Sequence, residues 1–408
     1  MTHHQNETQY GRYGLPLNVR FCTRCVISNQ RPSSTVEFKN KPAERKETIQ
    51  FNDQGVCSAC EYAHRKGHTI DWEKREQELL ALCNQYRNKD GRYDCVVPGS
   101  GGKDSGFTAH ILKNKYGMNP LTVTWAPHLY TDTGWQNFTN WSHIGGLDNI
   151  LFTPNGRVHR LLTRLAFENL LHPFQPFIIG QRHIGPKFAV QYNIPLVFYG
   201  ENQAEYGNNI EENDVPTMKE EFFAQDITPD TLFLGGIRAS ELIREKKVSL
   251  NDLNPYLPAP RVSIPRIGVQ VHYLGYYLKW DPQENYYYCA KHTGFQPNKE
   301  RTEGSYSKYS SIDDKIDPFH YYTTLIKFGI GRATYDAAQE IRNHKITREE
   351  GVALVKRFDQ EFPQKYFNEF LEYIGITEER FWERINFFRT PHLWEEKNGE
   401  WKLKYQVS

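Results

Sequence analysis

A strand, a glycine-rich turn and a helix follow one another in YDCVVPGSGGKDSGFTAHIL, residues 93–112. The apolar run at 95–98 predicts a buried strand, and the turn after it contains Gly99, Gly101 and Gly102. Glycines let the backbone approach an anion closely, and successive N–H groups and a helix N-terminus supply positive potential. We therefore expect a phosphate-binding turn at the end of a strand in an α/β sheet.

Two common kinds of phosphate loop do not fit this turn. A Walker A loop needs a glycine five residues before Gly102 and a serine or threonine after Lys103, but those positions hold Val97 and Asp104. A dinucleotide-binding turn needs a third glycine, and Asp104 stands in its place. An acidic residue inside an anion-binding turn makes chemical sense when Mg²⁺ lies between the carboxylate and the phosphates.

The segment SGGKDS, Ser100 to Ser105, resembles the S-G-G-x-D-S signature of the PP-loop ATP pyrophosphatases. The resemblance implies that the loop holds the departing pyrophosphate while an acceptor oxygen is adenylated. It also implies that Asp104 orients the loop or binds Mg²⁺, while Lys103, at the variable position, helps to neutralise phosphate. The implied pyrophosphate contacts are Ser100, Gly101, Gly102 and Ser105. We expect adenine beyond the end of the next strand, near Trp125, for which ordinary core packing is the alternative.

Strand-like and helix-like segments alternate along the middle of the chain. DCVVPGS, LTVTWAP, NILFTP and IPLVFYGEN predict buried strands, each followed or preceded by a helix-length segment, and VQVHYLGYYLKW predicts one more strand. A helix is predicted at 71–87 with Asp71 as its N-cap, and Thr347 and Glu350 form a capping box. The predicted fold class is α/β, a PP-loop parallel sheet of the adenine nucleotide α-hydrolase, Rossmann-like kind.

The predicted organisation has four parts. A loosely attached lead-in covers 1–20, a four-cysteine module 21–65, the PP-loop domain 66–300 and a helical region 301–408. The polar, Pro- and Asn-rich segment at about 204–260 is predicted to be an insertion in the PP-loop domain.

Four of the seven cysteines form two C-x-x-C pairs, Cys22 with Cys25 and Cys57 with Cys60. Two such knuckles are typical of a tetrahedral Zn²⁺ site, and the strand-like segments STVEF and TIQFND between them could close a zinc ribbon. Four thiolates leave no open coordination position, so we expect a structural rather than a catalytic metal. Redox-active or coincidental cysteines are the alternative.

Charge and hydropathy exclude several functions. The net charge is +1, which argues against electrostatic capture of nucleic acid. No apolar run is long enough to span a bilayer, and the first residues lack the apolar core of a signal peptide. The expectation is a cytoplasmic protein with no membrane span and no nucleic-acid partner.

The remaining cysteines, Cys83, Cys95 and Cys289, bear on the source of ammonia, which many PP-loop enzymes take from glutamine. A glutaminase nucleophile lies at a mature N-terminus or on a glycine-flanked turn, and none of these three has flanking glycines. If glutamine is used, a separate glutaminase subunit must deliver the ammonia.

From Cys22 onward the chain resembles the N-acetyl sugar amidotransferase family, PP-loop proteins of surface-polysaccharide, lipopolysaccharide-type and nonulosonic-acid biosynthesis. The resemblance rests on CTRCVIS, GVCSAC, VPGSGGKDS, FYGENQAEYG, YLGYYLKWDP, EGSYSKYSSIDDK and GIGRATYDAAQEIR, in that order. It implies conversion of an N-acetyl group into an acetamidino group with ATP, Mg²⁺ and ammonia. The acceptor is an N-acetylated sugar, either nucleotide-linked or a free nonulosonic acid.

Candidate residues for the acceptor side lie in two segments. Glu201, Asn202 and Glu205 follow a predicted strand end, where Glu201 or Glu205 could deprotonate the incoming ammonium. A polar–aromatic set follows residue 305, in which Lys308 or Lys315 could neutralise the α-phosphate or a sugar carboxylate. The predicted catalytic residues are Asp104, Lys103, Glu201 and Lys315, and the predicted sugar-binding residues are Asn202, Glu205, Tyr306 and Lys308. A polar loop and a solvated helix start are the structural alternatives.

Two other functions compete with this interpretation. A tRNA thiolation enzyme also combines zinc knuckles with a PP-loop, but it needs further reactive cysteines and a basic RNA surface. A non-catalytic zinc-ribbon module with a degenerate nucleotide fold is the other, and the intact SGGKDS segment argues against it.

Overall fold

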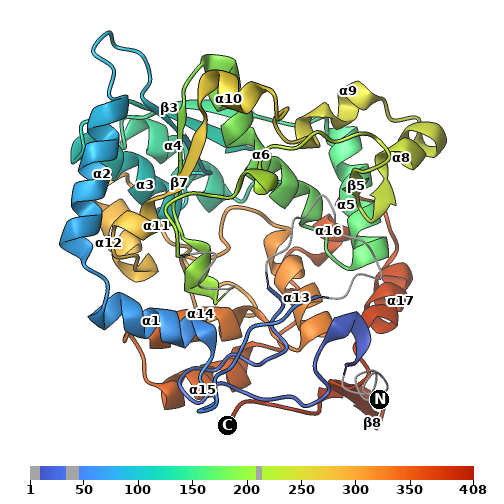
Figure 1. Cartoon of the computed structure of the whole chain (residues 1–408). Coiled ribbons are helices and arrows are strands. Elements are labelled where there is room, and N and C mark those ends of the chain that lie inside the picture. Colours follow the sequence, from blue (N-terminus) through green and yellow to red (C-terminus); the bar gives the residue numbers. More distant parts are fainter. Residues whose placement is uncertain (1–9, 34–45, 208–213) are drawn as a thin grey trace, which may run out of the picture.

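A computed structural model describes residues 10–33, 46–207 and 214–408. Its centre is a parallel five-stranded sheet in the order β3-β2-β1-β4-β7 (Figure 1). The strands are β1 (Cys95–Pro98), β2 (Pro120–Trp125), β3 (Asp148–Phe152), β4 (Leu196–Tyr199) and β7 (Gln270–Tyr273). This confirms the predicted α/β class, and all four sequence segments that predicted the first strands form them.

Helices cover both faces of the sheet because alternate strand residues point to opposite sides. Val96 and Val197 pack into the larger core with helices α5 and α6, whereas Val97 and Phe198 pack into a second core with α2 and α3. The helices up to this point are α1 (Ser58–His68), α2 (Trp72–Tyr86), α3 (Lys103–Asn114), α4 (Asp132–His143), α5 (Gly156–Leu170) and α6 (Gln175–Tyr192). The α2 N-cap is Asp71, whose side chain accepts a hydrogen bond from the Lys74 N–H, as predicted.

The described part of the segment between β4 and β7 packs into the larger core. Its hairpin of β5 (Phe233–Leu234) and β6 (Ile237–Arg238) and its short helices bury Leu232, Leu242 and Leu253 in the larger core. The helices are α8 (Ala239–Lys246), α9 (Leu250–Leu253) and α10 (Ser263–Ile267). The predicted single strand VQVHYLGYYLKW is wrong in its second half, because β7 ends at Tyr273 and α11 (Leu274–Tyr277) follows directly.

The region after residue 300 is helical, as predicted, and ends in a hairpin that the helical prediction missed. Its helices are α13 (Asp317–Phe328), α14 (Arg332–Arg342), α15 (Arg348–Phe358), α16 (Phe367–Ile374) and α17 (Glu378–Phe388), with α12 (Pro282–His292) before them. The hairpin consists of β8 (Trp394–Lys397) and β9 (Glu400–Leu403). The capping box of Thr347 and Glu350 is present at the start of α15.

The N-terminal segment is built around the cysteines and lies beside α14 and α15 (Figure 1). The segment TIQFND makes isolated bridges rather than a strand, and STVEF lies outside the described residues. The described part of the predicted loose lead-in is in fact packed, because Leu15 is fully buried and Tyr13 stands edge-on to Phe328. Apolar contacts therefore hold residues 10–20 against the C-terminal region.

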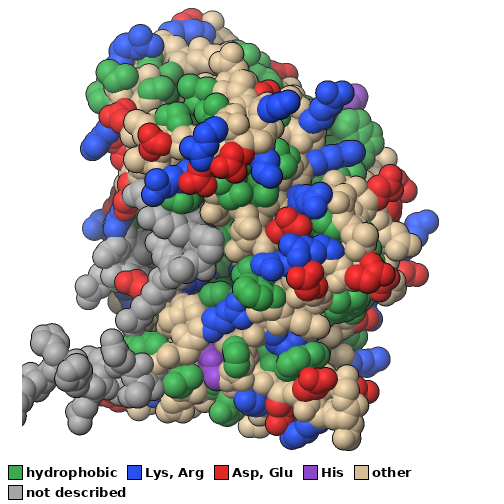
Figure 2. All heavy atoms as spheres, turned by 90° about the vertical axis from the view of Figure 1, so that its right-hand side faces the viewer, with side chains coloured by type: hydrophobic (Ala, Val, Ile, Leu, Met, Phe, Trp, Pro, Cys, Tyr) green, Lys and Arg blue, Asp and Glu red, His purple; other side chains and the backbone are tan. Residues whose placement is uncertain are grey.

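Among the described residues, no helix is long and apolar enough to cross a membrane. The face in Figure 2 carries Lys and Arg side chains interspersed with Asp and Glu, without a continuous basic stripe. That distribution agrees with the net charge of +1.

Candidate active site

The signature loop leaves the carboxyl end of β1 and enters α3, whose N-cap is Gly102. Gly101 has φ +82°, and a Cβ atom there would lie 2.8 Å from the Asn137 carbonyl oxygen. Both facts require glycine at this position. The Ser100 hydroxyl donates a hydrogen bond of 2.8 Å to Asp313. The loop is therefore fixed on one side by α4 and on the other by the C-terminal helical region.

A cavity of about 370 Å³, here called the loop cavity, opens between this loop and the ends of the neighbouring strands. Its lining includes Gly99, Ser100, Gly102, Asp104, Ser105, Tyr199, Glu201 and Tyr273. These residues follow or end β1, β4 and β7, which places the cavity at the carboxyl edge of the sheet. Ligands of open α/β sheets bind at this edge, so the loop cavity is the candidate nucleotide site.

Asp104 lies in the first turn of α3 and lines the loop cavity. Its carboxylate accepts hydrogen bonds from the Lys103 ammonium and the Asn285 amide, and its side chain is 36% exposed. Each carboxylate oxygen keeps a further lone pair, which suits a hard cation. The donor set next to an anion-binding turn thus fits Mg²⁺, with Asp104 as a protein ligand.

Glu201 follows β4 and accepts hydrogen bonds from the Trp280 indole at 3.3 Å and the Gln339 amide at 3.4 Å. Burial, and next the negative charge of Asp104, raises the pKa of the Glu201 carboxyl to about 7. A carboxyl with a pKa near neutral pH can exchange a proton in either direction.

A second and larger cavity of about 500 Å³, here called the arginine cavity, adjoins the first. The two share the lining residues Asp104, Ile178, Glu201, Gln203 and Tyr206. Its other walls carry Arg31 from the cysteine-rich segment and Arg332, Gln339 and Arg342 from α14. Three regions far apart in the sequence thus meet around Asp104 and Glu201, in a volume typical of a small-molecule site.

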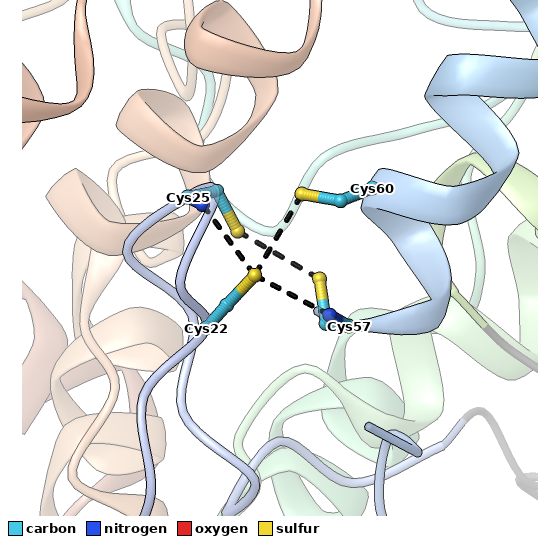
Figure 3. A group of neighbouring side chains, drawn as sticks. All are labelled: Cys22, Cys25, Cys57 and Cys60. Carbon is cyan, nitrogen blue, oxygen red and sulfur yellow. Dashed lines mark hydrogen bonds between the residues drawn. The ribbon is translucent and has the colours of Figure 1, made fainter. Parts of the chain in front are cut away.

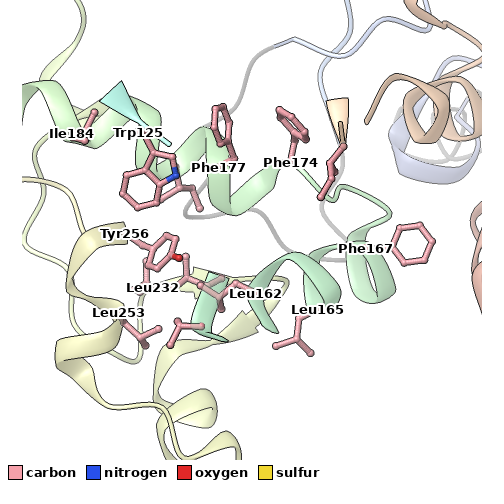
Figure 4. Packing of buried hydrophobic residues seen from close by; sticks show 14 of the residues in the cluster. Trp125, Leu162, Leu165, Phe167, Phe174, Phe177, Ile184, Leu232, Leu253 and Tyr256 are labelled. Carbon is pink, nitrogen blue, oxygen red and sulfur yellow. The ribbon is translucent and has the colours of Figure 1, made fainter. Parts of the chain in front are cut away.

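Trp125 does not line either cavity. Its ring is 3% exposed and packs among core residues, with Tyr256 at 5.4 Å and Gly180 against the indole (Figure 4). The structure therefore assigns Trp125 to the core and not to an adenine contact, because α6 covers the end of β2 where adenine was expected.

Gly101 of the predicted pyrophosphate contacts also lies outside the lining of both cavities. So do five of the predicted catalytic and sugar-binding residues, each of which is engaged elsewhere. Lys315 pairs with Glu369 at 2.7 Å, and Asn202 caps a short 3₁₀ helix through the Ala204 N–H. Glu205 forms a buried ion pair with Lys66 of α1 at 3.0 Å. The hydroxyl of Tyr306 donates to Glu340, and the ammonium of the exposed Lys308 donates to the Lys299 carbonyl oxygen.

The four cysteines of the two C-x-x-C pairs converge on one point (Figure 3). The Sγ atoms of Cys22 and Cys60 are 3.9 Å apart, and those of Cys25 and Cys57 are 3.7 Å apart. A tetrahedron with metal–sulfur bonds of about 2.3 Å has edges of about 3.8 Å, so the spacing fits Zn²⁺. Hydrogen bonds, first from Cys25, hold the pKa of the Cys22 thiol far below its usual value.

Sequence reasoning missed most of the arginine cavity. It treated the cysteine-rich segment as structural, while Arg31 and Arg342 received no role. A signal did exist, because GIGRATYDAAQEIR places two arginines at the ends of a strongly amphipathic helix.

The fold and the site define an α/β protein with the SGGKDS turn at the carboxyl end of β1. Residues 303–407 match the family described as "LPS biosynthesis protein WbpG-like, C-terminal domain". This part of the chain is therefore similar to the C-terminal domain of WbpG-like proteins, and it contributes α14 to the arginine cavity.

The other comparisons also cover only part of the chain. An uncharacterised protein of Methanocaldococcus jannaschii is 28% identical over 81 residues, which are 20% of this chain and 28% of that protein. The ammonia-dependent NAD synthetase of Campylobacter jejuni matches at a TM-score of 0.25 and 16% identity, over 35% of this chain and 59% of its own. The NMN synthetase of Francisella tularensis matches at 0.25 and 16%, over 33% and 56%.

Proposed function

We propose that this protein is an ATP-dependent amidotransferase that converts an N-acetyl group of a bacterial surface-polysaccharide sugar into an acetamidino group. One observation carries the proposal. The SGGKDS loop lies at the carboxyl end of β1 and faces a cavity that joins a larger one walled by the WbpG-like domain. A nucleotide-activating site and an acceptor site therefore share Asp104 and Glu201.

The reaction proceeds in two balanced steps. The acetamido oxygen attacks the α-phosphorus of ATP, and pyrophosphate leaves against the backbone N–H groups of residues 100–102 and the α3 N-terminus. Ammonia then adds to the carbon of the adenylated imidate, one proton is removed, and AMP leaves with the former acetamido oxygen. Mg²⁺, when bound at Asp104, neutralises phosphate charge. Adenylation is needed because an amide oxygen is otherwise a poor leaving group.

Glu201 is the group that removes the proton, since it is shared by both cavities and its pKa is about 7. Its Gln339 and Trp280 partners hold the carboxylate in place. Water must be kept from the imidate, because hydrolysis would regenerate the amide.

Ammonia comes from a separate glutaminase subunit in this proposal. All seven cysteines are buried, and four of them form the cluster. Cys289 is the cysteine nearest the loop, but its thiol donates to the Lys103 carbonyl oxygen and burial raises its pKa to about 12. Such a thiol is a poor nucleophile for glutamine at neutral pH.

The test is mass spectrometry of purified protein with ATP, Mg²⁺, ammonium and a panel of N-acetylated bacterial sugars. The expected products are AMP, pyrophosphate and a sugar in which an amide oxygen has been replaced by NH. AMP formation that requires tRNA and yields no modified sugar would instead establish the thiolation function.

Glu201→Gln is expected to lower amidine formation by at least ~10²-fold and to raise stability at alkaline pH. The folded-state pKa of about 7 lies above the usual 4.5. Wild-type stability therefore falls as pH rises from about 4.5 to about 7, because the folded state must release a proton that it binds more tightly. Glutamine does not ionise, so the variant does not lose this stability, which amounts to about 1–3 kcal/mol above pH 7.

Urea unfolding of both proteins at pH 5 and pH 8 measures this difference. The free energy of unfolding of the variant, relative to that of wild type, should be higher at pH 8 than at pH 5. Amidation by the wild-type protein should decline below pH 7. If the difference in stability between the variant and wild type is the same at pH 5 and pH 8, the pKa of Glu201 is not raised by folding.

A further inference from the structure

The side chain of Ser100 is bonded to a partner outside the loop cavity. Ser100 lines that cavity, but its hydroxyl donates a hydrogen bond of 2.8 Å to Asp313, which lines neither cavity. A serine hydroxyl has a single hydrogen to donate. While Asp313 accepts that hydrogen, the Ser100 hydroxyl cannot donate to a phosphate oxygen in the loop cavity.

The backbone around Asp313 is fixed against the start of α4. The Thr131 N–H donates to the Asp313 carbonyl oxygen at 3.2 Å, and the Thr131 hydroxyl donates to the Ile312 carbonyl oxygen. A Cβ atom at Gly134 would lie 2.5 Å from the Asp313 Cα atom, so the close approach of α4 requires glycine there. The fold itself therefore holds the Asp313 carboxyl group beside Ser100.

The charge of the Asp313 carboxylate is poorly compensated. In the part of the chain that the structure describes, it makes no ion pair, and Ser100 is its side-chain hydrogen-bond partner. The titratable groups that face it are Asp314 beside it, Asp317 at the start of α13 and Tyr130 before α4, and none of them is a cation. Burial raises the pKa of the Asp313 carboxyl, the Ser100 hydrogen bond lowers it, and the charge of Asp314 raises it.

The neighbouring Asp314 is much better compensated. Its carboxylate accepts hydrogen bonds from the His128 N–H at 2.7 Å and the Ile316 N–H at 2.9 Å, and it lies 2.7 Å from His128 Nδ1. Donors of this kind stabilise the ionised form of a carboxyl group. Asp313 has only the hydroxyl of a loop residue, so it is the carboxyl group of this segment that an anion entering the loop would protonate.

We propose that Asp313 is a positioning residue for the phosphates of ATP: it takes up a proton when they enter the loop cavity and so frees the Ser100 hydroxyl to donate to them. The protonated carboxyl group donates its own O–H to the Ser100 oxygen, and the Ser100 hydrogen turns to a phosphate oxygen. The proton comes from water and returns to water when pyrophosphate leaves. A neutral carboxyl group also removes a negative charge from beside the bound phosphates.

The proposal rests on ATP binding in the loop cavity, and the pH dependence of ATP affinity tests it. Isothermal titration of the full chain with ATP and Mg²⁺ from pH 6 to pH 8, in buffers with different ionisation heats, gives both the Kd and the number of protons taken up. A group that is protonated only in the complex weakens binding as pH rises, by at most about tenfold per pH unit.

Asp313→Asn is the diagnostic variant, because its amide donates to the Ser100 oxygen at every pH. It should take up fewer protons than wild type and bind ATP at least as tightly at pH 8. The ratio of wild-type Kd to variant Kd should grow by at least about threefold between pH 6 and pH 8. Glu201 and ATP itself also titrate in this range, but they do so in both proteins, so the difference between the proteins is the readout.

Two further variants complete the test. Asp226→Asn, at an exposed aspartate, should keep the wild-type pH dependence. Ser100→Ala should lose ATP affinity and proton uptake together, because no hydroxyl then joins Asp313 to the phosphates; it serves if Asp313→Asn does not fold, and unchanged proton uptake would overturn the proposal.

The outcomes separate this proposal from the proposed function. If Asp313→Asn weakens ATP binding by the same factor at every pH, or takes up as many protons as wild type, the carboxylate only anchors the loop and the proposal is wrong, although ATP still binds. If the wild-type protein binds neither ATP nor pyrophosphate, the loop cavity is not a nucleotide site, and the proposed function fails together with the role of Asp313.

Discussion

Asp104→Asn should abolish ATP-dependent AMP formation, by on the order of 10³-fold, while the protein stays folded. The carboxylate is the acidic group of the SGGKDS loop and lines both cavities. Its replacement removes the charge that holds Mg²⁺ against the phosphates and leaves the Asn285 and Lys103 side chains with a neutral partner. Its structural contribution is small, because a partly exposed ion pair and a first-turn acid are each worth about 1 kcal/mol or less.

Asp132→Asn is the matched control. Asp132 occupies the first turn of α4, the helix that follows the next strand of the sheet, and it is exposed. Both variants lose one first-turn carboxylate, so their melting temperatures should be similar. AMP release with acceptor present and ATP affinity with and without Mg²⁺ should separate them. If Asp104→Asn keeps wild-type AMP formation and Mg²⁺ dependence, the loop does not handle the pyrophosphate.

The sheet could be predicted because its strands are short apolar runs separated by helix-length segments. Val96, Val97 and their neighbours are buried on both faces, so their signal does not depend on distant partners. The loop is equally local, since Gly101 needs a left-handed φ and Gly102 starts α3. The convergence of the four cysteines was also visible, because the spacing of each pair is itself a local property.

The arginine cavity could not be predicted because it exists only after distant segments meet. Arg31, Glu201 and Arg342 are each unremarkable in their own stretch of sequence, and they come together through packing of the cysteine module and α14 against the sheet. Conversely, Glu205 and Tyr306 looked like ligand contacts, but each is used by a neighbour in the fold. The adenine contact predicted for Trp125 is wrong for the same reason, because Gly180 of α6 leaves room for the Trp125 ring in the core.

The cysteine module is therefore joined to the active site as well as to the fold. Lys66 in α1, six residues after Cys60, donates to Glu205, to the Trp280 carbonyl oxygen and to Asn343. Those contacts connect the module with the segment after β4 and with the end of α14. Loss of the metal site should consequently affect the arginine cavity through Arg31 and through this buried ion pair.

Cys22→Ala should remove the bound metal and lower stability by at least ~3 kcal/mol, because a structural zinc site contributes its binding energy to folding. Cys22 is the centre of the cluster: the backbone N–H groups of Arg24, Cys25 and Cys57 all donate to its sulfur, at 3.3–3.4 Å. Elemental analysis should find about one Zn²⁺ per wild-type chain and little in the variant.

Cys83→Ala is the control, because Cys83 is equally buried and lies outside the cluster, in α2. Truncating that thiol should cost about 1–2 kcal/mol, with zinc content unchanged. Zinc-free wild-type protein that unfolds no more easily than Cys83→Ala would show that the four thiols are not a metal site.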